Sequence, residues 1–258
     1  MYNGKKIAVI MPAYNAARTL RKTYDEVMAR GIVDTVIIVD DFSSDETTHI
    51  AETLPRTQVI HHDRNLGYGA NQKSCYAAAL KEGADIIIMV HPDYQYTPLL
   101  IPAMASMISS GLYQCVLGSR ILGGGALKGG MPLWKYTSNR ILTLIENLFI
   151  GARLSEYHTG YRAFDRDLLK ELDLQNTSDD FLFDNQILAQ IIWRGVTIAE
   201  ISCPTKYFPD ASSINFRSSL QYGLGCILVA IKYRLTRMGI IRSSLFTAPV
   251  KQDTAPAP

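Results

Sequence analysis

Apolar and polar positions follow two alternating patterns along the first half of the chain. Short runs rich in Val and Ile predict strands over residues 7–11, 35–40, 57–61, 85–90 and 114–118. The segments between them have helical length and begin near cap or turn residues; they cover 16–29, 45–54, 69–82 and 97–109. This alternation predicts an α/β fold with a mostly parallel central sheet flanked by helices.

After about residue 123 a glycine-rich stretch, "GGGALKGGMP", interrupts the alternation. Periodicity then predicts helices over 134–150 and 180–194, strands over 157–164 and 197–201, and a last helix over 216–240. That last helix is amphipathic, because leucines recur on one face, and the chain ends in "APAP". We therefore predict a domain over 1–215, an amphipathic helix over 216–240 and a disordered tail over 241–258.

Composition narrows the class of protein. The 258 residues are 47% hydrophobic and carry a formal net charge of +2, which is typical of a globular protein and does not suggest nucleic acid as a partner. Four cysteines without a C-x-x-C pair favour reduced thiols and a cytoplasmic location. The longest apolar stretch, 222–231, has about half of the roughly 20 residues that a membrane-spanning helix needs.

The segments that directly follow the predicted strands are mostly polar. They read "PAYN", "DDFSSD", "HHDRNLGYG", "HPDYQ" and "GSR". Turn and cap formation explains any one of these loops, but it explains all of them together less well. Because ligands of such sheets bind outside the carboxyl ends of the strands, the pattern predicts a polar site at that edge.

The order of seven motifs resembles the family-2 glycosyltransferases. The motifs are "IAVIMPAYNA", "IIVDDFSSDET", "NLGYGANQ", "HPDYQ", "GSR", "TGYRAF" and "FDNQIL", and the resemblance covers about residues 5–235. Within the family the chain is most similar to the dolichyl-phosphate mannose synthase branch, which includes bacterial polyprenyl-phosphate glycosyltransferases. The resemblance implies a single A-type glycosyltransferase domain that binds a nucleotide-diphosphate sugar and inverts its anomeric centre.

The same resemblance implies a set of donor-binding residues after the first three strands. The first group packs against the nucleotide base, and the carboxylates of the second accept hydrogen bonds from the base or ribose. The third group lies in a loop whose glycines permit close backbone approach to a ligand. The three groups are Pro12, Ala13 and Tyr14; Asp40 and Asp41; and Asp63, Asn65 and Gly67. Tyr14 is equally compatible with helix-entry packing.

A divalent cation is implied by the loop after the fourth strand. The family carries an Asp-x-Asp motif there, often with glutamine two residues later, and His91, Asp93 and Gln95 occupy the three positions. Alternate side chains of an extended segment point the same way, so we expect the three to converge. Oxygen ligands suit Mg²⁺, whereas an imidazole suits Mn²⁺ better. His91 is also compatible with a contact to ribose or phosphate, or with capping the strand end.

Charged residues further along complete the predicted site. Arg120 and Lys135 match cationic positions that grip phosphates, where the leaving diphosphate gains charge. Lys135 replaces a more usual arginine and also reads as a surface lysine. Asp184 corresponds to the general base of members that act on hydroxyl acceptors. A phosphate acceptor needs no strong base, and Asp184 would then act by binding Arg162 or a donor hydroxyl. Arg162, in the segment where the family builds part of the sugar-facing wall, is also expected to bind substrate.

We expect transfer of a sugar to a polyprenyl phosphate at the cytoplasmic membrane face. Two alternatives stay open: transfer to a sugar hydroxyl in polysaccharide synthesis, and a non-catalytic degenerate transferase that acts as a binding module, for which His91 is the argument. The last helix carries Lys232, Arg234 and Arg237 beside its apolar face, as in peripheral helices on anionic membranes. A core-packing helix or a homo-oligomer contact would look similar.

Overall fold

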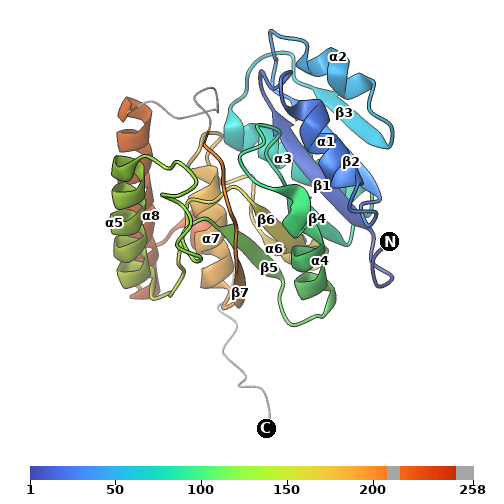
Figure 1. Cartoon of the computed structure of the whole chain (residues 1–258). Coiled ribbons are helices and arrows are strands. Elements are labelled where there is room, and N and C mark those ends of the chain that lie inside the picture. The colour runs from blue at the N-terminus through green and yellow to red at the C-terminus, as the bar shows by residue number, and fades with distance from the viewer. Residues whose placement is uncertain (208–215, 248–258) are drawn as a thin grey trace.

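A seven-stranded sheet in the order β3-β2-β1-β4-β6-β5-β7 forms the centre of the molecule (Figure 1). The computed structural model describes residues 1–207 and 216–247, without the side chains of 216–218. The strands are β1 Ile7–Ala13, β2 Thr35–Asp40, β3 Thr57–His61, β4 Ile86–Met89, β5 Cys115–Ser119, β6 Arg162–Asp165 and β7 Ile198–Ser202. Only β6 runs antiparallel to its neighbours, so the predicted mostly parallel sheet is confirmed.

Every predicted helix is present in the described part of the chain. The helices are α1 Leu20–Met28, α2 Thr47–Glu52, α3 Tyr68–Lys81, α4 Ile101–Ser109, α5 Leu133–Ile150, α6 Arg166–Glu171, α7 Phe183–Trp193 and α8 Phe216–Arg237, with 3₁₀ turns η1 Pro98–Leu100 and η2 Ser244–Phe246. The sequence did not predict α6, because six residues are too short to show a 3.6-residue period.

Two hydrophobic cores lie on opposite faces of the sheet because successive strand residues point in opposite directions. In β1, Ala8 and Ile10 join the core under α3 and α7, whereas Ile7 and Val9 join the core under α1 and α4. Helix α8 packs on α7 and pairs along α5 at the side of the molecule (Figure 1). Both faces of the central strands are therefore buried, as their continuous apolar runs predict.

The reversed direction of β6 brings an additional segment to the site edge. Arg162, the first residue of β6, is level with Met89 of β4 and Leu117 of β5, near the carboxyl ends of both strands. Residues 157–161, which precede β6, therefore lie beside the loops that follow β4 and β5. For an antiparallel strand it is the preceding segment that contributes to this edge.

The beginning of the predicted disordered tail is folded. Leu245 and Phe246 are buried, and the Phe246 ring lies 5.3 Å from both Trp193 of α7 and Tyr233 of α8. The prediction of disorder over 241–258 is therefore wrong for 241–247, because Leu245 and Phe246 pack into the core at α7 and α8. Residues 248–258 lie outside the described part.

The apolar stripe predicted for the last helix faces outward. Leu220, Leu224 and Leu228 are each more than half exposed, whereas the opposite side of α8 buries Cys226 and Val229 against the core. Within residues 1–207 and 216–247, no helix combines the length and hydropathy needed to cross a membrane.

Candidate active site

The loop after β1 is joined to the loop after β2. The Asn15 N–H donates to Ser43 Oγ at 2.8 Å, and Asn15 Oδ1 accepts from the Ser44 N–H at 2.9 Å. Pro12 and Ala13 are still buried members of β1, so the turn begins two residues later than predicted. Tyr14 alone of the three predicted base contacts has an exposed side chain, at 55%.

Asp40 is directed into its own loop. Its carboxylate is 3% exposed and accepts from the Ser43 N–H, the Ser43 hydroxyl and the Thr48 hydroxyl, the last at 2.8 Å. A buried carboxylate needs such donors because desolvation otherwise destabilises its charge. The Asp40 side chain therefore holds its own loop, and its expected contact with base or ribose stays a prediction.

The Asp41 carboxylate also contacts protein groups of a neighbouring loop. Oδ1 accepts from the Leu66 N–H at 2.9 Å and lies 2.7 Å from His62 Nδ1, while Oδ2 accepts from the Gly67 N–H at 2.9 Å. Asp41, a residue with 3% exposure, fixes the loop after β3, and its expected contact with the donor stays a prediction. Asp63 and Asn65 of that loop are exposed, and Asp63 borders a surface hollow.

The two glycines at the start of α3 lie against main-chain atoms of the segment before α7. A Cβ at Gly69 would lie 2.4 Å from the Ser178 carbonyl oxygen, and one at Gly67 would lie 2.6 Å from the Asp179 carbonyl oxygen. The Gly69 N–H donates to that Asp179 oxygen at 2.7 Å. The close approach predicted for Gly67 is thus a contact between the start of α3 and the segment before α7.

His91 and Asp184 are connected through Tyr68, the first residue of α3. The Tyr68 hydroxyl donates to Asp184 Oδ2 at 2.8 Å and lies 3.1 Å from His91 Nε2. Since its single proton goes to Asp184, the Tyr68 hydroxyl is an acceptor toward His91, and Nε2 of His91 is the donor. A Cβ at Gly160 would lie 2.1 Å from the same Nε2 atom. Only Nδ1 of His91 remains for a metal or a substrate.

Donors surround the Asp184 carboxylate. Oδ1 accepts from Gln72 Nε2 at 2.9 Å and lies 3.5 Å from Arg162 Nη1, so the expected contact between Asp184 and Arg162 is present. Burial raises the pKa of Tyr68 well above its usual range, and the Asp184 charge raises it further, so this tyrosine stays a donor. Asp184 itself is 8% exposed.

Arg162 has no solvent-exposed surface. Its guanidinium donates to the main-chain carbonyls of Thr159 at 2.7 Å, Asp184 at 2.7 Å and Tyr157 at 3.0 Å. Burial alone would lower its pKa, but the pKa is raised because Asp184 offsets the lost hydration. Arg162 therefore connects the segment before β6 to α7, and its expected contact with substrate stays a prediction.

Arg120 is paired with a buried acid that the sequence did not indicate. Its Nε donates to Glu156 Oε1 at 2.8 Å, Nη1 donates to the Tyr207 hydroxyl at 3.0 Å, and Nη2 donates to the His158 carbonyl at 2.6 Å. Burial would lower the pKa of Arg120 and raise that of Glu156, yet mutual attraction shifts both the other way. The charge of Arg120 is thus largely compensated within the protein.

Lys135, in the first turn of α5, differs from Arg120 in this respect. Burial lowers its pKa, and the nearby Arg120 charge lowers it further. The Nζ atom of Lys135 lies 5.4 Å from the centre of the Trp134 ring. Among the described residues, no carboxylate forms an ion pair with Lys135. Lys135 therefore supplies a positive charge that the described part of the protein leaves uncompensated.

Asp93 and Gln95 lie in a turn and not in the extended segment that we expected. Asp93 Oδ1 accepts from the Gln95 N–H at 3.0 Å, and Tyr94 between them has a φ of +61°. No three His, Cys, Asp or Glu side chains gather as a metal site in the described ranges. A carboxylate and an amide carbonyl two residues apart, both half-buried, nevertheless fit a hard cation that takes its other ligands from a diphosphate and water.

Sequence reasoning missed Tyr68, Gln72 and Glu156. Tyr68 and Gln72 stand within the quoted motif "NLGYGANQ", and their four-residue separation on a helix was the available signal, since such residues share a face. Glu156 offered no signal: its importance follows from the buried Arg120, which needs a counter-charge.

Comparison with known proteins agrees with this architecture. The model of the glycosyl transferase family 2 matches residues 8–173, more than half of the chain, and the protein belongs to this family. A UDP-N-acetylglucosamine–dolichyl-phosphate N-acetylglucosaminyltransferase of Methanococcus voltae is 28% identical over 79% of this chain and 86% of its own. An undecaprenyl-phosphate mannosyltransferase of Micrococcus luteus is 27% identical over 66% of this chain and 70% of its own.

Among solved structures, glucosyl-3-phosphoglycerate synthase from Mycobacterium tuberculosis, in complex with Mn²⁺, uridine diphosphate and glucosyl-3-phosphoglycerate, shares the fold. The TM-score is 0.67 at 18% sequence identity, covering 93% of this chain and 82% of that one. The predicted single A-type glycosyltransferase domain is confirmed.

Replacing Gly69 with alanine is expected to destabilise the protein, because the new methyl group would meet main-chain oxygens of 178 and 180 that cannot move cheaply. We expect a loss of about 2 kcal/mol in the free energy of unfolding, measured by urea denaturation. Gly125→Ala is the matched control, since no atom lies within 4 Å of its Cβ position. Equal stability of the two variants would contradict this account of the α3 contact.

Proposed function

We propose that the protein transfers a sugar, with inversion, from a nucleotide diphosphate to a polyprenyl phosphate. The observation that carries this choice of acceptor is the environment of Asp184. Tyr68 and Gln72 donate to its two oxygens, and Arg162 lies beside one of them. Such a carboxylate is poorly placed to take a proton from a hydroxyl acceptor, whereas a phosphate brings its own anionic nucleophile. The names of the dolichyl- and undecaprenyl-phosphate relatives support the same acceptor.

The donor diphosphate would bind at the turn after β4. Asp93 and Gln95 are the residues that would hold a divalent cation, Mn²⁺ or Mg²⁺, and His91 Nδ1 is the atom left for a further contact to it or to the donor. Such a cation, when bound, neutralises charge on the leaving diphosphate. The exposed ring of Tyr14 is the group available for stacking on the nucleotide base.

The acceptor phosphate would bind on the opposite side, beside Lys135. Because Glu156 already compensates Arg120, we assign Arg120 to orienting the loop after β5 and Lys135 to attracting the phosphate. Asp184 then orients the Tyr68 hydroxyl and, through it, His91. In this proposal Arg120 has a structural role and Lys135 binds the acceptor phosphate.

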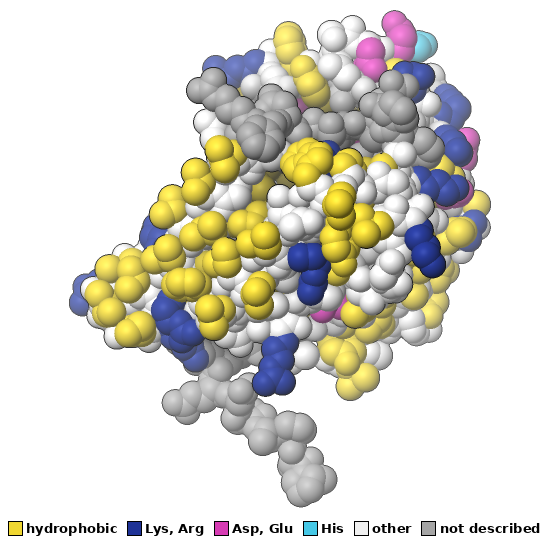
Figure 2. Space-filling view, turned by 60° about the vertical axis from the view of Figure 1, so that its left-hand side comes forward, with side chains coloured by type: hydrophobic (Ala, Val, Ile, Leu, Met, Phe, Trp, Pro, Cys, Tyr) yellow, Lys and Arg dark blue, Asp and Glu magenta, His cyan; other side chains and the backbone are white. Residues whose placement is uncertain are grey.

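An exposed apolar surface adjoins Lys135 and fits the lipid part of the acceptor. We call the exposed side chains of α5 and α8 the apolar face; its members are Leu133, Trp134, Ile141, Leu144, Leu148, Leu220, Leu224 and Leu228. Figure 2 shows hydrophobic side chains gathered over this side of the molecule, with Lys and Arg between and below them. Exposed apolar area on this scale marks an interaction surface. A peripheral contact with an anionic membrane at its cytoplasmic side follows from the proposal.

The first test offers radiolabelled UDP- and GDP-sugars and polyprenyl phosphate in detergent, with Mg²⁺, Mn²⁺ or chelator. We expect lipid-soluble label from one donor, its loss with chelator, and at least a hundredfold slower transfer by Asp93→Asn. Asp184→Asn, which keeps an acceptor oxygen for Tyr68, should cost much less. Near-abolition by Asp184→Asn together with labelled glycan would instead establish a hydroxyl acceptor. No turnover or hydrolysis of any donor would leave a non-catalytic binding module.

Lys135 predicts a pH dependence. The charged form attracts the acceptor, and its pKa is lowered from 10.5, so kcat/KM for polyprenyl phosphate should fall at a lower pH than an ordinary lysine allows. Lys135→Arg should remove this alkaline fall, because a guanidinium stays charged. Lys135→Met should raise KM for the acceptor about tenfold at neutral pH. An unchanged acceptor KM in Lys135→Met would remove this residue from the site.

The apolar face predicts binding to anionic vesicles. Leu144→Glu combined with Leu224→Glu should abolish co-flotation with phosphatidylglycerol vesicles, because two charges would enter the interface. Leu112→Glu, a change at an equally exposed leucine outside this face, is the control and should still float. If the double variant floats like the control, the proposal of a membrane contact is wrong. Dimerisation of the unmodified protein that the double variant loses would assign the face to a second copy.

A further inference from the structure

Tyr94 separates the two residues proposed to hold the cation, Asp93 and Gln95, and its backbone conformation is unusual. Its φ of +61° lies in the left-handed region, which residues other than Gly, Asn and Asp rarely adopt. Glycine would occupy this position without steric cost. An aromatic residue here indicates that contacts of its side chain offset the backbone strain.

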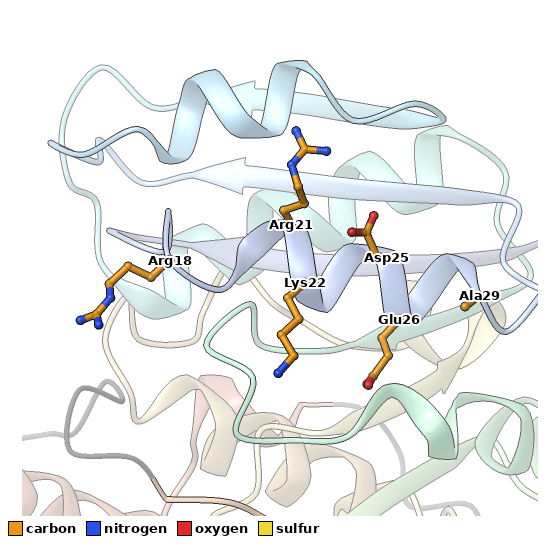
Figure 3. Close-up of a pocket in the computed structure, with 6 residues that line it drawn as sticks. All are labelled: Arg18, Arg21, Lys22, Asp25, Glu26 and Ala29. Carbon is orange, nitrogen blue, oxygen red and sulfur yellow. The ribbon is translucent and has the colours of Figure 1, made fainter.

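Those contacts are made with α1. The Tyr94 hydroxyl donates to Glu26 Oε1 at 2.6 Å, and Lys22 Nζ lies 3.9 Å from the centre of the ring. Figure 3 shows Lys22 and Glu26 leaving α1 on one side of the helix, while Arg21 and Asp25 leave on the other. The side chain of Tyr94 is therefore held at its polar end by a charged hydrogen-bond acceptor and at its face by a cation.

Hydrogen bonds to main-chain atoms hold the rest of the turn. The Thr23 hydroxyl of α1 lies 3.2 Å from the Pro92 carbonyl oxygen, and the Lys206 N–H donates to the Gln95 carbonyl at 3.2 Å. Asp93 Oδ1 accepts from the Gln95 N–H within the turn. The side chain of Tyr94, between Asp93 and Gln95, leaves the turn toward α1.

We propose that Tyr94 is a positioning residue that clamps the cation-binding turn onto α1 and so preorganises Asp93 and Gln95 for the metal–diphosphate. The inference rests on the proposed function, because it takes these two residues as the cation ligands. A turn held in its binding geometry before the cation arrives loses less conformational entropy on binding. The bond to Glu26 raises the pKa of Tyr94, with a smaller contribution from burial, and this keeps the hydroxyl protonated as a donor.

The test compares three variants of the full chain. Tyr94→Phe removes the hydroxyl and keeps the ring over Lys22, Tyr94→Gly removes both contacts and the backbone strain, and Glu26→Gln keeps a neutral acceptor. The readouts are the affinity for Mn²⁺ in the presence of UDP, from the electron paramagnetic resonance signal of free Mn²⁺, and amide hydrogen exchange of residues 92–97 in metal-free protein.

We expect Tyr94→Gly to bind Mn²⁺ with UDP about tenfold more weakly or worse, and Tyr94→Phe and Glu26→Gln to lie between it and the unmodified protein. Exchange over 92–97 should be faster in all three without metal. Asp25→Asn, on the other side of α1, is the matched control and should match the unmodified protein in both readouts.

Unchanged Mn²⁺ affinity in Tyr94→Phe and Tyr94→Gly would overturn the clamp, as would a lowered melting temperature with unaltered affinity, which would indicate packing alone. If Tyr94→Gly does not fold, Tyr94→Phe still decides the outcome. Failure of the proposed function would look different: the unmodified protein itself would bind Mn²⁺ with neither UDP nor GDP.

Discussion

The guanidinium of Arg162, buried without solvent exposure, is the interaction on which the arrangement of the candidate site depends. A charge removed from water in this way must be surrounded by acceptors, because leaving it unpaired would cost several kcal/mol. Its donors reach carbonyls of Thr159, Tyr157 and Asp184, which belong to two segments distant in the sequence. The start of α7 and the segment before β6 are thereby fixed to each other. Through Asp184 this order extends to Tyr68, and from Tyr68 to His91.

Buried acids of this protein mostly serve the architecture. Asp40 and Asp41 fasten loops at the end of β2, and Glu156 neutralises Arg120. Each carboxylate is surrounded by donors because a buried charge is stable only when its lone pairs are occupied. The residues that we propose to bind substrates, Tyr14, Asp93 and Lys135, are less buried.

These binding residues lie on two sides of the same sheet edge. Tyr14 follows β1 and Asp93 follows β4, and these two strands are neighbours in the sheet. Lys135 lies in the first turn of α5, at the side of the molecule where α5 and α8 expose apolar residues (Figure 1). A nucleotide and a lipid phosphate have opposite requirements, one for polar loops and the other for an apolar surface. Their separation across the edge explains how one site would accept both. The Tyr68 network lies between the two sides.

The sequence by itself determined the strands other than β6, the predicted helices, the mostly parallel sheet and the edge that carries the polar loops, because periodicity and turn chemistry are local properties of the chain. The strand predicted over 157–164 begins only at Arg162. Only the tertiary structure decided which polar side chains the loops themselves enclose. Asp41 and Asp93 both follow a buried strand and look alike in sequence, yet His62 and two main-chain N–H groups surround Asp41, while Asp93 lies in a half-buried turn. The direction of β6, the exposure of the α8 leucines and the burial of Phe246 were decided in the same way. Each depends on which distant segments meet, and a hydrogen bond or an apolar contact is satisfied by whichever partner the packing supplies.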